Sequence, residues 1–171
     1  MLSDLLKKIT LVKTINMKQI ILLLGLSLTL FACHPDGRVY VKHVDLSPNI
    51  EWLKKDIKEF KVPIEDNAMT YDLSLSFRFA TGYQFEVAKV KVTEISPSGK
   101  ENTKEYDLLV RNEKGEYIGK PGFDIWDSEH KIESHKKYEE TGIYTYTIEH
   151  IMPTDPLHYA MEIGVILDEV K

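Results

Sequence analysis

The chain has 171 residues, a net charge of −5 and a single cysteine, Cys33. This length fits one ordinary domain, and the acidic balance argues against nucleic acid as a partner and against binding of anionic lipid through a basic patch. A single cysteine excludes an intramolecular disulfide, so the stability of the fold must come from buried apolar side chains.

The N-terminal segment has the pattern of a secretory signal that ends at a lipidated cysteine. Lys18 supplies a positive charge, and Ile20 to Ala32 is an uncharged apolar run that falls short of the roughly 20 residues needed to span a bilayer. Leu30-Phe31-Ala32-Cys33 resembles the lipobox of bacterial lipoproteins. We therefore expect residues 1–32 to be a signal peptide and Cys33 to carry acyl chains such as palmitate.

Two starts are compatible with this pattern. Met17 begins a well-formed signal, whereas a start at Met1 adds a long n-region with further lysines. In both cases the mature chain begins at Cys33 and has 139 residues. Loss of residues 1–32 removes four lysines and one aspartate, so the net charge changes from −5 to −8. Attachment of so acidic a chain to a membrane must therefore depend on its acyl groups.

The mature chain begins with a polar tether, His34-Pro35-Asp36-Gly37. Alternating residues after it predict a first strand over residues 38–44. We therefore divide the mature chain into residues 33–50, which hold the lipidated cysteine, the tether and the first strand, and residues 51–171, which form the main domain.

The clearest strand covers Tyr71 to Ala80, where apolar residues at strict period two occupy one face and polar residues occupy the other. Tight-turn signals such as Pro97-Ser98-Gly99 separate it from the segments that follow. Further segments predict strands over residues 59–64, 87–95, 104–111, 143–151 and 157–170.

Three details of these segments make specific predictions. Pro63 places the strand over 59–64 at a sheet edge. The last strand is nearly continuous in apolar residues, as is typical of a central strand covered on both faces, and Gly164 within it suggests a bulge or a close backbone approach. Asp127 to Glu140 is charged and has few apolar residues, so we expect a long surface loop there.

Seven or eight strands, with turn signals roughly every 8–12 residues, are typical of an antiparallel β-sandwich of the jelly-roll or immunoglobulin-like type. The predicted fold class is therefore all-β. No repeat of fixed period is present in the sequence, which argues against a propeller or a solenoid.

The sequence shows no motif that assigns catalysis, a cofactor or a metal ion. It lacks H-E-x-x-H, G-x-S-x-G, a P-loop, G-x-G-x-x-G and an EF-hand loop. His130 and His135 are spaced so that they would not share one helical face, and Asp124, Asp127 and Glu129 are interpreted as a solvated acidic segment. We expect no catalytic residue, cofactor or metal. A hydrolase with two catalytic carboxylates stays open as a third hypothesis. The sequence has too many acidic residues for one catalytic pair to be identified among them.

Aromatic residues in or beside loops are the remaining candidates for binding. Trp126, Tyr117 and Trp52 are the candidate contacts for a partner protein or a glycan, since exposed rings stack on sugars and anchor protein interfaces. The competing interpretation is that these rings close the ends of the sandwich. The glycan hypothesis requires the rings to be exposed and coplanar in one patch.

Short motifs recur in a characteristic order along the mature chain. They are Cys33, Arg38-Val39-Tyr40, Trp52, Phe60 with Ile64, Tyr71 to Arg78, Pro97-Ser98-Gly99, Gly115 to Gly119 with Gly122 and Asp124-Ile125, Gly142-Ile143-Tyr144, Met152 and Ile163-Gly164. In this order they resemble the gliding motility lipoprotein GldH family. Tyr117 stands where the family pattern has Trp, and Pro153 stands where it has Arg.

The resemblance implies a cell-envelope lipoprotein that is needed for surface gliding and tied to the type IX secretion machinery. It implies partners among the other gliding and secretion proteins of the envelope, in addition to the membrane held through the lipid anchor, and no catalytic residues. His34 after the cysteine is not Asp, so retention in the inner membrane is not signalled, and an acidic run for surface export is missing. We therefore expect the outer membrane, with the domain facing the periplasm.

Overall fold

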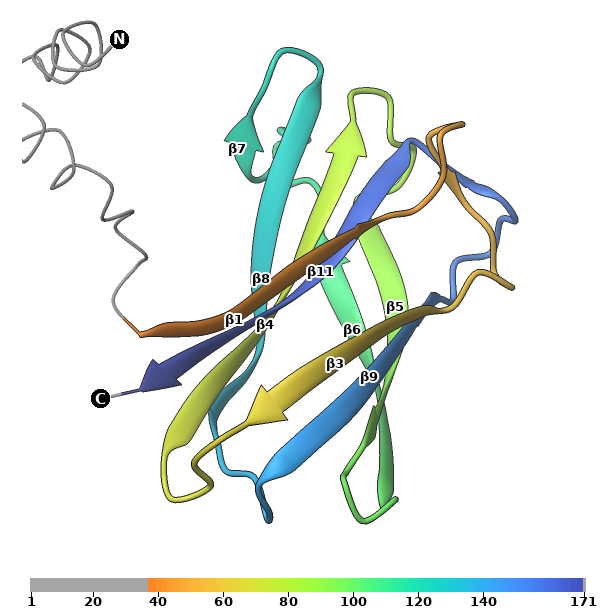
Figure 1. The fold of residues 1–171 in the computed structure, drawn as a ribbon. Coiled ribbons are helices and arrows are strands. Elements are labelled where there is room, and N and C mark those ends of the chain that lie inside the picture. The colour runs from red at the N-terminus through yellow and green to blue at the C-terminus, as the bar shows by residue number, and fades with distance from the viewer. Residues whose placement is uncertain (1–36, 171) are drawn as a thin grey trace, which may run out of the picture. The chain divides into compact units, whose positions relative to one another are not determined.

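The computed structural model describes residues 37–170, and every regular element among them is a β-strand (Figure 1). The signal peptide over residues 1–32, both candidate starts and Cys33 lie outside the described residues. None of the described residues forms a helix that is long and apolar enough to cross a membrane. The all-β prediction is confirmed.

The strands form two larger sheets and one short pair. The five-stranded sheet has the order β1-β11-β4-β8-β7, the four-stranded sheet has the order β3-β9-β5-β6, and β2 pairs with β10. All pairings are antiparallel. The strands are β1 (Arg38–Asp45), β2 (Glu51–Trp52), β3 (Lys58–Ile64), β4 (Thr70–Ala80), β5 (Val87–Ile95), β6 (Glu101–Leu109), β7 (Lys120–Pro121), β8 (Ile125–Lys136), β9 (Gly142–His150), β10 (Leu157–His158) and β11 (Ala160–Val170).

The two larger sheets lie face to face around one apolar core, as predicted for a β-sandwich. Every second residue of β4 from Tyr71 to Phe79 is buried, and so is every second residue of β9 from Tyr144 to His150. Successive side chains of a strand point to opposite faces, so this alternation directs one side of each sheet inward. Each large apolar side chain buried there contributes about 1.5–3 kcal/mol.

The predictions for the edge and central strands are confirmed. Pro63 lies on β3, which is the first strand of the four-stranded sheet and therefore an edge. The last strand, β11, lies between β1 and β4, and its residues 163–167 are buried on both faces. A Cβ atom on Gly164 would overlap the His43 ring and the Ser76 hydroxyl, so the close approach expected at this glycine is present.

The prediction of a surface loop over residues 127–140 is wrong, because most of this segment forms the twelve-residue strand β8. β8 pairs with β4 from Ala80 to Tyr71, and some of its polar side chains have partners on β4. Asp127 pairs with Arg78 at 2.6 Å, and the Ser128 hydroxyl donates to the Phe77 carbonyl at 2.9 Å. Pairing with a neighbouring strand has overridden a composition that favoured a loop.

β1 is the first strand after the tether and belongs to the five-stranded sheet, where it pairs with β11 from Arg38–Asp168 to Asp45–Glu162. We call the end of the sandwich where β1 begins, at Arg38, the proximal end. The end where β1 stops, at Asp45, is the distal end. The β7–β8 hairpin turn lies at the distal end, because Ile125 at the start of β8 pairs with Ala80, the last residue of β4 (Figure 1).

Candidate functional site

Two of the predicted contact residues, Tyr117 and Trp126, lie against each other near the distal end. Their ring centroids are 5.2 Å apart and their planes meet at 36°. Trp126 is on β8, where it pairs with Phe79 and with Pro121 of β7. Both side chains are half-buried. The structure therefore brings these two residues together, but as a tilted pair and not as the coplanar platform that the glycan hypothesis requires.

Polar contacts hold the Tyr117 ring in place. The Gly82 backbone N–H donates to the Tyr117 hydroxyl at 2.8 Å, and Arg111 donates to it at 2.9 Å. The Arg111 guanidinium also lies 4.6 Å from the centre of the Tyr117 ring, in cation–π contact. Burial alone would raise the pKa of Tyr117, but the hydrogen bonds from Arg111 and Gly82 lower it below its ordinary value. The ring is therefore fixed in one orientation.

The third predicted contact residue, Trp52, is fully buried, so its assignment as a surface contact is wrong. Its indole N–H donates to the Asp56 carbonyl at 2.8 Å, and its ring lies 5.3 Å from the buried His150 ring. The short pairing of Trp52 with Leu157 closes the core at this position. Trp52 therefore fits the competing interpretation, in which the aromatic rings close the ends of the sandwich.

Three exposed apolar residues at the distal end were missed by reasoning from the sequence. Phe123 is 101% exposed, Tyr159 is 41% exposed and Ile50 is 39% exposed. Pro121-Gly122 is a turn signal directly before Phe123, and it could have placed this aromatic residue at a hairpin tip. Nothing in the local sequence marks Ile50 or Tyr159 as exposed.

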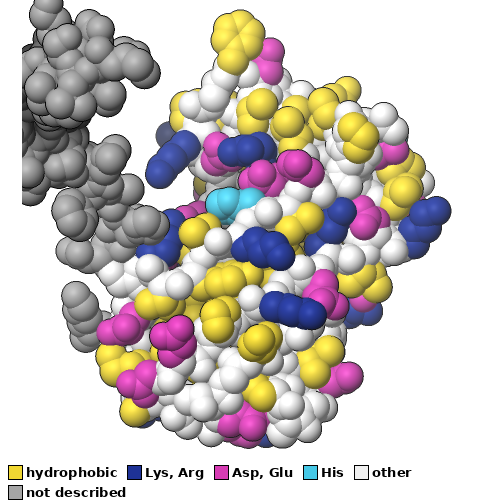
Figure 2. Space-filling model, viewed as in Figure 1, with side chains coloured by type: hydrophobic (Ala, Val, Ile, Leu, Met, Phe, Trp, Pro, Cys, Tyr) yellow, Lys and Arg dark blue, Asp and Glu magenta, His cyan; other side chains and the backbone are white. Residues whose placement is uncertain are grey.

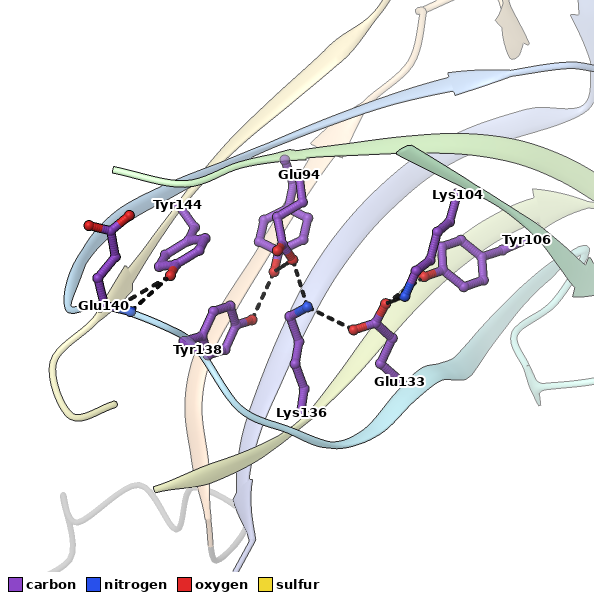
Figure 3. Close-up of polar contacts among 9 residues, drawn as sticks. Glu94, Lys104, Tyr106, Glu133, Lys136, Tyr138, Glu140 and Tyr144 are labelled. Atoms are coloured by element: carbon purple, nitrogen blue, oxygen red, sulfur yellow. Dashed lines mark hydrogen bonds and ion pairs between the residues drawn. The ribbon is translucent and has the colours of Figure 1, made fainter. Parts of the chain in front are cut away.

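A cluster of charged residues and tyrosines joins the two sheets toward the proximal end (Figure 3). Lys136 on β8 contacts Glu94 on β5 and Glu133 on β8, each at 2.8 Å. Glu133 also accepts hydrogen bonds from Lys104 at 2.6 Å and from Tyr106 at 2.9 Å, both on β6. Because β8 belongs to one sheet and β5 and β6 to the other, these contacts tie the sheets together.

The tyrosine side of the cluster is buried. The Tyr146 hydroxyl donates to Glu94 at 2.5 Å and is 2.8 Å from the Tyr138 hydroxyl. The Tyr138 ring lies 4.6 Å from the Tyr144 ring, edge to face. Burial raises the pKa of both Tyr138 and Tyr146 above the ordinary value. These phenols therefore stay protonated at neutral pH.

Glu133 and Lys136 are held in their charged forms. Burial would raise the pKa of Glu133, but hydrogen bonds from Lys104, Lys136 and Tyr106 lower it to about 2. Burial would lower the pKa of Lys136, but hydrogen bonds to Glu133 and Glu94 raise it above its ordinary value. A carboxylate with so low a pKa gives up its proton well below neutral pH, which does not suit a general acid at physiological pH.

A surface hollow of about 280 Å³ lies beside this cluster. Glu94, Lys136, Tyr138 and Tyr144 are shared between the hollow and the cluster, and charges of both signs line the remainder. Among residues 37–170, no group of three or more His, Cys, Asp or Glu side chains is arranged to hold a metal ion. The ion pairs and hydrogen bonds of the cluster join the two sheets.

These features define a β-sandwich domain in which half-buried ion pairs join the sheets and aromatic residues gather at the distal end. The family model described as GldH lipoprotein matches residues 38–167, nearly all of the sandwich. The chain therefore belongs to the GldH lipoprotein family, and the resemblance predicted from the sequence is confirmed. The family comprises lipoproteins of gliding motility, with a lipid-anchored location in the cell envelope.

A curated relative and two solved structures are similar to this chain. The relative is the gliding motility lipoprotein GldH homolog of Christiangramia forsetii, with 29% identity over 129 residues, covering 74% of this chain and 76% of the relative. The first structure is BtGH115A, a family GH115 4-O-methyl-α-glucuronidase, with 13% identity and a TM-score of 0.37, covering 82% of this chain. This chain spans only 19% of that enzyme's length.

The second structure is TmCBM61 in complex with β-1,4-galactotriose. It has 13% identity and a TM-score of 0.27, and the match covers 77% of this chain and 81% of that chain. Both TM-scores are too low to support an argument about fold or ligand.

Proposed function

We propose that this protein is a non-enzymatic interaction component of the gliding motility apparatus and of the associated type IX secretion machinery. It is attached through acylated Cys33 to the outer membrane, and its domain faces the periplasm and binds other envelope proteins. The observation that best supports this proposal is the family match over residues 38–167, because the matched residues make up the folded domain.

The chemistry of the charged cluster supports a structural rather than a catalytic role. Lys136 bridges Glu94 and Glu133, so the most buried charges of the cluster are paired with one another. Buried charges that are paired and hydrogen-bonded stabilise one arrangement of the chain. A carboxylate that acts as a general acid or base would instead need a pKa near the working pH, and the pKa of Glu133 is about 2.

Deletion of the gene followed by complementation tests this function. We expect the deletion strain to lose gliding and secretion through the type IX system, and the wild-type chain to restore both. Cys33→Ala should lose acyl labelling, leave the outer-membrane fraction and fail to restore gliding. Normal gliding and secretion in the deletion strain would contradict the proposal, and an unmodified Cys33 in a soluble fraction would contradict the anchor.

Glycan binding is the second candidate function, and the half-exposed Tyr117–Trp126 pair is the observation that favours it. Because the two planes meet at 36°, a sugar ring would stack on one ring of the pair and not on a coplanar platform. Binding to a glycan array that is lost in Trp126→Ala would support this function. Equal array signals for the wild-type chain and Trp126→Ala would exclude a role for the pair.

A further inference from the structure

Phe123 has the highest exposure among the large apolar side chains of the described residues. It lies in the short turn between β7 and β8, which is closed by a hydrogen bond from the Gly122 N–H to the Ile125 carbonyl at 2.6 Å. An aromatic ring at a hairpin tip has no neighbours in its own chain to cover it. Its whole apolar surface is therefore available for burial against another molecule.

Ile50 and Tyr159 are exposed at the same end and adopt a strained backbone. Their φ angles are 56° and 64°, and the Tyr159 N–H donates to the Ile50 carbonyl at 2.8 Å. A positive φ is a genuine outlier for a β-branched or bulky residue, and such strain clusters at functional sites. Both apolar side chains are partly exposed to solvent at these strained positions.

Phe123 and Tyr159 flank the turn at the end of β4. The Ala80 N–H donates to the Tyr159 carbonyl at 2.9 Å, and the next N–H, of Thr81, donates to the Asp124 carbonyl beside Phe123 at 2.9 Å. In Figure 2, hydrophobic side chains are seen at the top, over the β7–β8 hairpin tip and the loops beside it. We name this surface the distal apolar rim, made of Ile50, Phe123 and Tyr159.

The length of the tether indicates what covers the rim. Four residues separate Cys33 from β1. An extended chain spans at most about 3.3–3.6 Å per residue, so an acylated Cys33 holds Arg38 within about 20 Å of the membrane surface. The rim lies at the other end of β1, an eight-residue strand that is roughly 26 Å long. Anchoring at the proximal end therefore favours a protein, and not the anchoring bilayer, as the occupant of the rim.

We propose that the distal apolar rim is the docking surface for another envelope protein, which supplies an apolar pocket for the Phe123 ring. Aromatic side chains that fill a pocket at the centre of an interface dominate binding energies. This inference rests on the proposed function, because it assumes a lipid-anchored protein that works through partners. It differs from the predicted contacts in placing Phe123, and not the Tyr117–Trp126 pair, at the centre.

The test compares Phe123→Asp with a matched control in the full, lipidated chain. The control is Ile143→Asp, because Ile143 is 56% exposed and lies on β9 at the proximal end, away from the rim. Each variant is expressed in the deletion strain, and its amount, acylation and melting temperature are measured. A photo-activated cross-linker is placed at position 123 or 143 in separate strains, and the products are identified by mass spectrometry.

We expect position 123 to form a cross-link of defined mass to one gliding or secretion protein, and position 143 to form none with it. The amount of that protein that co-purifies with the chain should fall at least about tenfold in Phe123→Asp and stay unchanged in Ile143→Asp. Gliding should fall with it, while the melting temperatures of both variants stay at the wild-type value. Cross-links from position 123 to lipid alone, or to a second copy of this chain alone, would overturn the inference.

Complementation separates the two levels of the proposal. If the deletion strain glides and secretes normally, the proposed function is wrong and this inference falls with it. If the deletion strain is defective and Phe123→Asp restores it fully, the rim is not the docking surface, although the proposed function stands.

Discussion

Replacing Lys136 by Met is a direct test of the cluster that joins the two sheets. Lys136 contacts Glu94 in the opposite sheet and Glu133 in its own strand, each at 2.8 Å. Methionine keeps much of the side-chain length but removes the charge, so both carboxylates lose the cation they share. Glu94 then keeps the Tyr146 hydroxyl as a hydrogen-bond donor.

The expected cost follows from how far the cluster is shielded from water. The side chain of Lys136 is 11% exposed, and those of Glu94 and Glu133 are 18% and 17% exposed. Removing one partner of a fully buried ion pair costs about 3–5 kcal/mol, and the remaining solvent access reduces this to about 2–3 kcal/mol. For a domain of this size, that corresponds to a fall of roughly 8–12 °C in melting temperature.

The same variant makes a prediction about pH. The folded-state pKa of Glu133, about 2, lies below the unfolded value of about 4.3. The stabilisation from Glu133 is therefore present above about pH 4.3 and is lost as the pH falls toward 2. Protonation also removes the unpaired charge in Lys136→Met, so the difference in melting temperature between the two proteins should narrow as the pH is lowered.

Thermal unfolding followed by circular dichroism at neutral pH and at about pH 3.5 measures both effects. The exposed neighbour Lys137 supplies the control, since Lys137→Met removes the same charge at the surface and should change the melting temperature by less than about 2 °C. A fall of less than about 3 °C for Lys136→Met at neutral pH would refute the reasoning. So would a difference that is the same at both pH values.

Three further predictions concern single positions. Gly164→Ala forces a methyl group against the His43 ring and the Ser76 hydroxyl, and should cost about 1–3 kcal/mol in a denaturant titration; unchanged stability would contradict the close contact. Burial lowers the pKa of His150, so stability should fall as the pH drops below about 6.5. Urea unfolding at two pH values should show a smaller pH-dependent loss for His150→Phe than for the wild-type chain. Ile50→Gly removes the strain of a positive φ and should stabilise the domain by up to about 1 kcal/mol while weakening docking at the rim; a lower melting temperature would argue against strain at this position.

The sequence predicts those strands in which alternation is visible locally. Tyr71 to Ala80 is assigned correctly because the face of each residue depends only on its position in the strand. β8 could not be found in this way, since two of its inward side chains, Ser128 and His130, are polar and interrupt the apolar alternation of Trp126 and Ile132. Its strand conformation depends on pairing with β4, about fifty residues earlier in the chain, which a local pattern does not encode.

The binding residues show a different limit of sequence reasoning. Trp52 and Phe123 are both aromatic residues near turns, yet one is fully buried and the other is fully exposed. The aromatic character of the two side chains does not predict this difference, which depends on the tertiary structure. The Trp52 indole donates to the Asp56 carbonyl within the fold, whereas Phe123 lies beyond Ile125 and Ala80, the last pair between β8 and β4.

The pairing of β1 with β11 has a mechanical consequence for a protein that is anchored at one end and held by a partner at the other. A pull between the tether and the distal end acts along the length of β1, parallel to the strand. The seven residue pairs that join β1 to β11 are then loaded simultaneously in shear, instead of being opened one after another from an end. Such a sheet resists tension well, which fits the proposed lipid anchor at the proximal end and the proposed partner at the distal end.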